Sequence, residues 1–167
     1  MNEESWNQRI NDFYSNEFNE QDPEASIARM RELSSMRAPG DAAALFELGG
    51  VHDSLGLEST AITYYRQAIT AGLDGERASR VQIQLASTLR NLGSVDEAIE
   101  ILQAPSPNGL DDDARQAFLA LALFDAGRFG DALRTALMAL IPTLDGYRRA
   151  LTEYAGELPT ELDNESN

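Results

Sequence analysis

Apolar residues recur every three or four positions along most of the chain, which is the pattern of helices that bury one face. In the stretch QIQLASTLRNLG, residues 82–93, Leu85, Leu89 and Leu92 form such a stripe opposite polar side chains. The pattern predicts three helix pairs, at 41–55 and 58–71, at 75–92 and 95–103, and at 111–126 and 129–141. The sequence therefore predicts an all-α fold.

The two ends of the chain add helices outside these pairs. Asp22 is a good N-cap residue directly before Pro23, which predicts a helix start at this point. Residues 1–40 thus form a degenerate helix pair, which either packs on the first repeat or crosses to a second subunit. Its apolar positions are Trp6, Ile10, Phe13, Tyr14, Ile27, Met30 and Leu33. A last helix at 143–157 is expected to cap the array; it carries Leu144, Tyr147, Leu151 and Tyr154.

The helix pairs share a register. Gly56, Gly93 and Gly127 end helix-like stretches and are spaced by 37 and 34 residues. Five positions after each glycine stands an alanine (Ala61, Ala98 and Ala132). Eight positions before each glycine stands a leucine (Leu48, Leu85 and Leu119). The residue directly after each leucine is small (Gly49, Ala86 and Ala120). Glycine permits the left-handed conformation at a helix end, and small residues let helices approach closely.

This register resembles the tetratricopeptide repeat (TPR), a helix-turn-helix unit of about 34 residues. The resemblance implies a right-handed α-solenoid at 41–157, with repeats at about 42–75, 79–112 and 113–146 followed by the capping helix. The stretch GLDGERASRVQIQLASTLRNLGSVDEAI is also similar to a small actinobacterial TPR family of unassigned function. That similarity implies a bacterial protein with a role in protein–protein interaction.

Charge and composition narrow the function. The chain has 167 residues, a net charge of -15 and a pI near 4.3, which argue against binding nucleic acid or anionic membranes. It has no cysteine, and all 13 basic residues are arginines. No apolar run is long enough to span a membrane, and the N-terminus lacks a signal-peptide pattern, so a cytoplasmic location is expected. The acidic segment 158–167 is expected to be a disordered tail.

The sequence contains no convincing catalytic set. His52 is the single histidine, and in this register it packs between helices. His52 and Asp53 are adjacent on a helix and point about 100° apart, so they do not converge on a metal ion. The run Asp111–Asp113 is typical of a helix start. We therefore expect neither an enzyme nor a protein with a cofactor or metal.

A binding groove is easier to derive. In TPR arrays the first helix of each pair lines a concave face. Phe46 and Gly50 stand where peptide-clamping TPR proteins carry a lysine and an asparagine, so no clamp of that type is expected. The register places on this face Ala43, Phe46, Gly50 and Asp53; Arg77, Arg80, Ile83, Gln84, Ser87, Arg90 and Asn91; and Ala114, Ala117, Leu121 and Phe124.

Several functions fit this groove. It could bind a peptide or partner protein, with Arg80 and Arg90 holding a carboxylate and with Phe46 and Phe124 as apolar anchors. Alternatively, acids of the same chain already pair with the arginines. A self-associating homodimer and a small acidic client chaperone are the other candidates. An enzyme would require His52, Arg80, Gln84 and Arg90 to gather around a small molecule.

Overall fold

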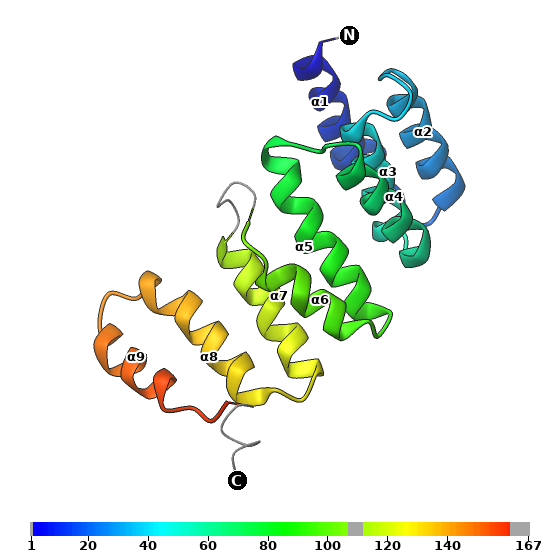
Figure 1. The fold of residues 1–167 in the computed structure, drawn as a ribbon. Coiled ribbons are helices and arrows are strands. Elements are labelled where there is room, and N and C mark those ends of the chain that lie inside the picture. Colours follow the sequence, from blue (N-terminus) through cyan, green and yellow to red (C-terminus); the bar gives the residue numbers. More distant parts are fainter. Residues whose placement is uncertain (1, 107–111, 161–167) are drawn as a thin grey trace.

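The computed structural model describes residues 2–106 and 112–160, and within these ranges the chain forms helices and no strand (Figure 1). The predicted all-α fold is therefore confirmed. The elements are α1 (Glu3–Asp12), a π-helical turn η1 (Phe13–Glu17), α2 (Pro23–Ser35), α3 (Ala42–Ser54), α4 (Glu58–Thr70), α5 (Gly75–Asn91), α6 (Val95–Gln103), α7 (Asp112–Asp125), α8 (Phe129–Leu140), a 3₁₀ turn η2 (Ile141–Thr143) and α9 (Arg148–Gly156).

Three antiparallel pairs, α3–α4, α5–α6 and α7–α8, stack in chain order as in a solenoid (Figure 1). The first helices also contact one another, α3 with α5 and α5 with α7. Each pair turns at one of the three glycines of the register. Gly56, Gly93 and Gly127 have φ of 68°, 82° and 77°, a left-handed conformation that glycine adopts without steric cost. The glycine register thus predicted these turns correctly.

Small residues bring the two helices of the first pair together. A Cβ atom at Gly49 on α3 would lie 2.5 Å from the ring of Tyr65 on α4, which is fully buried. Ala61, Ala68 and Ala98 are also fully buried. They belong to one apolar core that runs from α3 to α8. This core explains why the register tolerates only small residues at these positions.

The N-terminal helices pack on the first repeat. Asp22 caps α2 by accepting a hydrogen bond from the backbone N–H of Ala25, with Pro23 in the first turn, as predicted. Trp6, Phe13 and five other buried apolar residues of α1, η1, α2 and α3 form a second core. The indole Nε1 of Trp6 donates to the carbonyl oxygen of Leu33 at 2.9 Å. Of the two arrangements expected for 1–40, the structure has the one within a single chain.

The junction between the second and third pairs is fastened by a buried arginine. Helix α6 ends at Gln103, before Pro105, as expected. Arg115 on α7 is only 3% exposed, and its guanidinium donates to the carbonyl oxygens of Ile101, Leu102 and Ala104. These carbonyls lie at the C-terminal end of α6, where they have no partner within the helix and the dipole favours a cation. Arg115 therefore acts as the cap of α6.

The C-terminal helix differs from the prediction. Helix α9 begins at Arg148, not at 143, because the Asp145–Gly146 turn and Tyr147, with φ of 64°, interrupt the helix. Tyr147 and Tyr154, two of the residues noted for that helix, are 87% and 64% exposed, so their helical spacing does not correspond to a buried face. Instead, Arg134 of α8 fastens α9 by donating to the backbone carbonyls of Ala155, Gly156 and Leu158.

Two expectations fall wholly or partly outside the described residues. Asp111 of the aspartate run lies there, although α7 does start at the next residue. Residues 161–167 of the predicted tail also lie there. Within the described part, no helix has both the length and the apolar character needed to cross a membrane.

Candidate partner-binding groove

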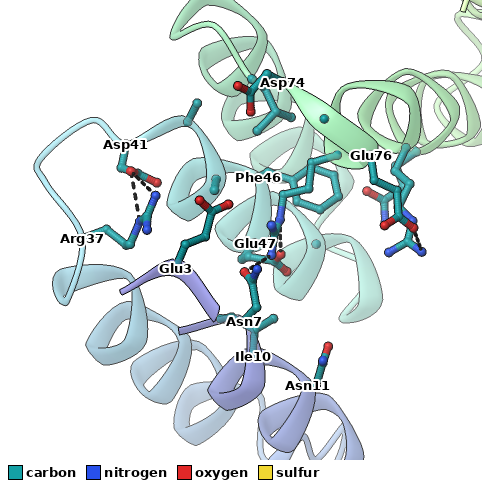
Figure 2. Close-up of a pocket in the computed structure, with 18 of the residues that line it drawn as sticks. Glu3, Asn7, Ile10, Asn11, Arg37, Asp41, Phe46, Glu47, Asp74 and Glu76 are labelled. Atoms are coloured by element: carbon teal, nitrogen blue, oxygen red, sulfur yellow. Dashed lines mark hydrogen bonds and ion pairs between the residues drawn. The ribbon is translucent and has the colours of Figure 1, made fainter. Parts of the chain in front are cut away.

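A hollow near the predicted site lies between α1, α3 and the start of α5 (Figure 2). It has a volume of about 710 Å3. Six of the fifteen residues predicted for the groove line it, namely Ala43, Phe46, Gly50, Arg77, Arg80 and Gln84. The other nine do not, so the predicted continuous groove is divided. They are Asp53, Ile83, Ser87, Arg90, Asn91, Ala114, Ala117, Leu121 and Phe124.

The floor of this cavity is a buried ion pair. Arg77 Nε lies 2.9 Å from Glu47 Oε1, and Arg77 Nη2 donates to Asn7 Oδ1 at 3.0 Å. One guanidinium thus joins α5, α3 and α1. Glu47 is 5% exposed, and burial raises the pKa of its carboxyl group, although Arg77 acts in the opposite direction.

The Trp6 ring packs against the arginine of this ion pair and against Arg37. The guanidinium carbons of Arg37 and Arg77 lie 5.1 and 5.4 Å from its ring centroid, within cation–π range. Arg37 also pairs with Asp41, which caps α3. Burial alone would raise the pKa of Asp41, but hydrogen bonds from Arg37 and the backbone N–H of Ala44 outweigh it and lower that pKa. The arginines therefore hold α1 in place as one wall of the cavity.

All three arginines among the predicted groove residues are paired with acids of the same chain. Arg77 pairs with Glu47, Arg80 pairs with Glu76 one helical turn before it, and Arg90 Nε lies 2.6 Å from Asp125 Oδ2 on α7. Of the two alternatives for Arg80 and Arg90, internal pairing is the one found in the structure. Arg77 and Arg90 tie neighbouring helices together, whereas Arg80 pairs within α5, and none of the three presents an unpaired cation.

Three positions expected to be exposed are buried. Phe46 and Ile83 are 6% and 8% exposed and belong to the main core, where Phe46 packs beside Tyr65 with centroids 6.1 Å apart. Gly50 is buried against Tyr14, whose hydroxyl would lie 2.8 Å from an added Cβ. The expectation of Phe46 as a free apolar anchor was therefore wrong, because Phe46 packs into the core that α3 shares with α4 and α5.

Asp53 takes a structural role. It accepts hydrogen bonds from the Tyr65 hydroxyl at 3.1 Å and the Thr88 hydroxyl at 2.9 Å, so it joins α3, α4 and α5. Burial raises the pKa of its carboxyl group, and these two hydrogen bonds act to lower it. His52 is 3% exposed, with Nδ1 2.6 Å from the Leu48 carbonyl oxygen, as expected for a residue packed between helices.

The remaining predicted positions lie at the surface. Ser87 is half-buried and Asn91 is exposed. On α7, Leu121 and Phe124 are 47% and 59% exposed, as expected, and the Phe124 ring contacts Phe129 of α8 edge-on at 5.1 Å. The face formed by the first helix of each pair thus has a polar hollow near α3, in the first repeat, and exposed apolar side chains on α7, in the third repeat.

The prediction missed an entire wall of the hollow. Glu3, Asn7 and Asn11 line it from α1, and Asp74 lines it at the opposite edge (Figure 2). Glu3, Asn7 and Asn11 are spaced by four, so the sequence already indicated a polar stripe along this helix beside Trp6 and Ile10. Among the described residues, no group of three or more acidic, histidine or cysteine side chains gathers to hold a metal ion.

A stack of short antiparallel helix pairs turned at glycines defines an α-solenoid repeat protein. Residues 42–158 match the sequence model of the Tetratrico peptide repeat family, and the chain belongs to this family. Such repeats generally mediate protein–protein interaction and typically serve as non-enzymatic scaffolds. A comparison with curated proteins finds none that matches the chain.

Proposed function

We propose that this protein is an interaction scaffold that binds a basic segment of a partner protein in the hollow between α1, α3 and α5. The observation that carries the proposal is the charge balance of the lining. Five carboxylates face three arginines, and each arginine pairs with an acid of this chain. Within the described residues, Glu3 and Asp74 are left without an arginine partner.

The surplus carboxylates select the chemistry of the partner. An arginine or lysine of an incoming segment can donate to Glu3 or Asp74, which both line the hollow, and a carboxylate–guanidinium hydrogen bond of this kind is charge-assisted. The net charge of -15 adds long-range attraction for basic partners and speeds their encounter. This reverses the sign of the partner that Arg80 and Arg90 suggested in the sequence.

The shape of the hollow is compatible with such a segment. Its volume of about 710 Å3 lies within the range of about 300–1,000 Å3 for clefts that enclose a compact ligand. Gln84 lines it and has a buried side-chain oxygen with no hydrogen-bond partner in the described part of the chain. An incoming N–H group would satisfy this oxygen once the Gln84 side chain turns it toward the hollow. The cytoplasmic location and the likeness to an actinobacterial family remain predictions alongside this proposal.

A charge-matched pair of variants tests the proposal. Peptides selected from a displayed library of random sequences, which contains acidic and basic members alike, are titrated against the wild type, Glu3→Gln/Asp74→Asn and the control Glu20→Gln/Glu100→Gln. Both double variants lose two negative charges, but Glu20 and Glu100 are exposed and lie outside the hollow. Emission from Trp6, the single tryptophan, gives a local readout beneath the hollow.

The expected result is a loss of about tenfold or more in affinity for the groove variant and less than about twofold for the control. Binding should weaken as NaCl rises. If both double variants bind the peptide equally weakly, the loss of affinity is explained by net charge alone, which would contradict a site in the hollow. Selection of acidic peptides would contradict the proposed partner chemistry.

A further inference from the structure

A stripe of side chains along the N-terminal helix ends at an aromatic residue in the hollow. Glu3, Asn7 and Asn11 of α1 line the hollow at spacings of four, and Asn7 and Asn11 can be followed along α1 in Figure 2. Tyr14 of η1 also lines the hollow and follows Asn11 by three positions, so it continues the same helical face. The charge balance of the lining gives this ring no role.

Two contacts orient the Tyr14 ring at the hollow. The ring stands edge-on to that of Phe13, with the centroids 5.0 Å apart and an interplanar angle of 72°. Its hydroxyl group lies against the backbone of α3, where it would be 2.8 Å from a Cβ atom added at Gly50. Phe13 is fully buried in the N-terminal core, whereas Tyr14 is 37% exposed. The structure therefore leaves part of an aromatic ring open to the hollow.

The charges around this ring are not balanced. Burial raises the pKa of the Tyr14 hydroxyl, and the carboxylates of Glu47 and Asp53 raise it further. Arg77 acts in the opposite direction but has a smaller effect than either carboxylate. Glu47 is paired with Arg77, whereas Asp53 accepts hydrogen bonds from two hydroxyl groups and has no arginine partner among the described residues. A cation placed beside Tyr14 would balance the remaining negative charge.

The floor of the hollow already holds one cation in surroundings of this kind. The guanidinium of Arg77 lies over the ring of Trp6. It also pairs with the carboxylate of Glu47 and donates to the amide oxygen of Asn7. A guanidinium can combine such partners because its five donors lie in one plane, so its face stays free to stack on a ring. A lysine ammonium is a compact, strongly hydrated charge that has no such plane.

We propose that the end of the hollow beside Tyr14 takes an arginine side chain of the partner in preference to a lysine, with the guanidinium stacked on the Tyr14 ring. This inference rests on the basic-segment site proposed above and names the residue that the site selects. Asn11 is exposed one turn before Tyr14, and its amide oxygen can accept a hydrogen bond from the edge of the guanidinium. The uncompensated carboxylate of Asp53 favours the positive charge.

Three synthetic peptides, Gly-Ala-X-Ala-Gly with both ends blocked, test the preference, where X is arginine, lysine or citrulline. Lysine keeps the charge without the planar group, and citrulline keeps the planar shape without the charge. Each peptide is titrated to millimolar concentration against the isotope-labelled full chain. The nuclear magnetic resonance signals of the side-chain amides of Asn7, Asn11 and Gln84 report binding, because these three residues line the hollow.

We expect the wild type to bind the arginine peptide about fivefold or more tightly than the lysine peptide and about tenfold or more tightly than the citrulline peptide. Tyr14→Leu should lower the preference for arginine over lysine to less than about twofold, whereas Tyr14→Phe keeps the ring and should retain most of it. Tyr154→Leu is the control, because Tyr154 is exposed on α9 and lies outside the hollow. Circular dichroism checks the folding of each variant.

Equal affinities of the wild type for the arginine and lysine peptides would overturn the preference for arginine and leave the basic-segment site standing. A preference that survives Tyr14→Leu, or that Tyr154→Leu abolishes equally, would overturn the role of the Tyr14 ring. If neither basic peptide shifts the amide signals, or if citrulline binds as tightly as arginine, both the basic-segment site and this inference are contradicted. The failure of the preference and the failure of the site are therefore distinguishable.

Discussion

Arg77 on α5 lies with its Nε 2.9 Å from Oε1 of Glu47 on α3, and the two side chains are 20% and 7% exposed. The pair joins the first helices of two successive repeats at the floor of the hollow. Because Arg77 also donates to Asn7, it fixes the position of α1. The same contact therefore holds the array together and shapes its candidate binding site.

Removing this arginine should be costly. Arg77→Met leaves Glu47 buried without its cation, and we expect a loss of about 2–4 kcal/mol in the free energy of unfolding at pH 7. The loss should shrink near pH 4, where Glu47 is protonated in both states. Urea unfolding at the two pH values measures it. Glu47→Leu with Arg77→Met should be less destabilised than the sum of the single variants, and strict additivity would contradict direct coupling.

The two adjacent glycines of α3 should respond differently to alanine. At Gly49 the new Cβ meets the ring of Tyr65, which is fully buried and hydrogen-bonded to Asp53, so we expect a loss of about 1–3 kcal/mol. At Gly50 it meets only the hydroxyl of Tyr14, a partly exposed side chain that can move. Gly50→Ala should be neutral or stabilising by up to about 1 kcal/mol, from higher helix propensity. Thermal and urea unfolding compare the two variants, and similar effects at both sites would contradict the packing described.

The two arginines of the predicted stripe should also differ. Arg80 and Glu76 are both more than half exposed, so Arg80→Ala should change the stability by less than about 0.5 kcal/mol. Arg90 is 25% exposed and joins α5 to Asp125 on α7, and Arg90→Ala should cost about 1 kcal/mol. Urea midpoints at matched ionic strength compare them. A larger effect at Arg80 would be inconsistent with these contacts.

Asp53 should give stability a measurable pH dependence. Its folded pKa lies above its unfolded value, mainly through burial, so the folded state binds the proton more tightly. Stability from this group is thus fully present below the unfolded pKa and is lost as pH rises through the folded pKa. Asp53→Asn removes this titration, although the amide accepts one hydrogen bond fewer. The deficit of the variant relative to wild type should be smaller at pH 7 than at pH 4, and a deficit that grows with pH would refute this assignment.

The turns and close contacts of the fold followed from the sequence because they depend on local chemistry. Gly93 and Gly127 could be placed from their own conformational preference, and Asp22 with Pro23 defined the start of α2 in the same way. The start of α9 was misplaced because helical spacing from Leu144 onward hid the Asp145–Gly146 turn. Burial of Phe46 was missed because it depends on how α4 and α5 pack against α3, which no local pattern records.

The candidate site was predicted less well for a related reason. The partner of Arg80 lies four residues away and was readable from the sequence. The partners of Arg77 and Arg90 lie 30 and 35 residues away, so they depend on the stacking geometry of the repeats. These pairs change the expected charge of the hollow from positive to negative. Arg77, Arg80 and Arg90 suggested an acidic partner, but each of them already pairs with an acid of the same chain.

The Arg115 cap bears on how the chain unfolds. Helices in this array contact mainly their neighbours in sequence, and such arrays can open from an end, one unit at a time. A guanidinium on α7 that holds three carbonyls of α6, and that also donates to Gln82 on α5, ties the last repeat to the middle one. Backbone amides of α5, α6 and α7 should therefore exchange with deuterium as a single cooperative unit, with α9 opening ahead of them.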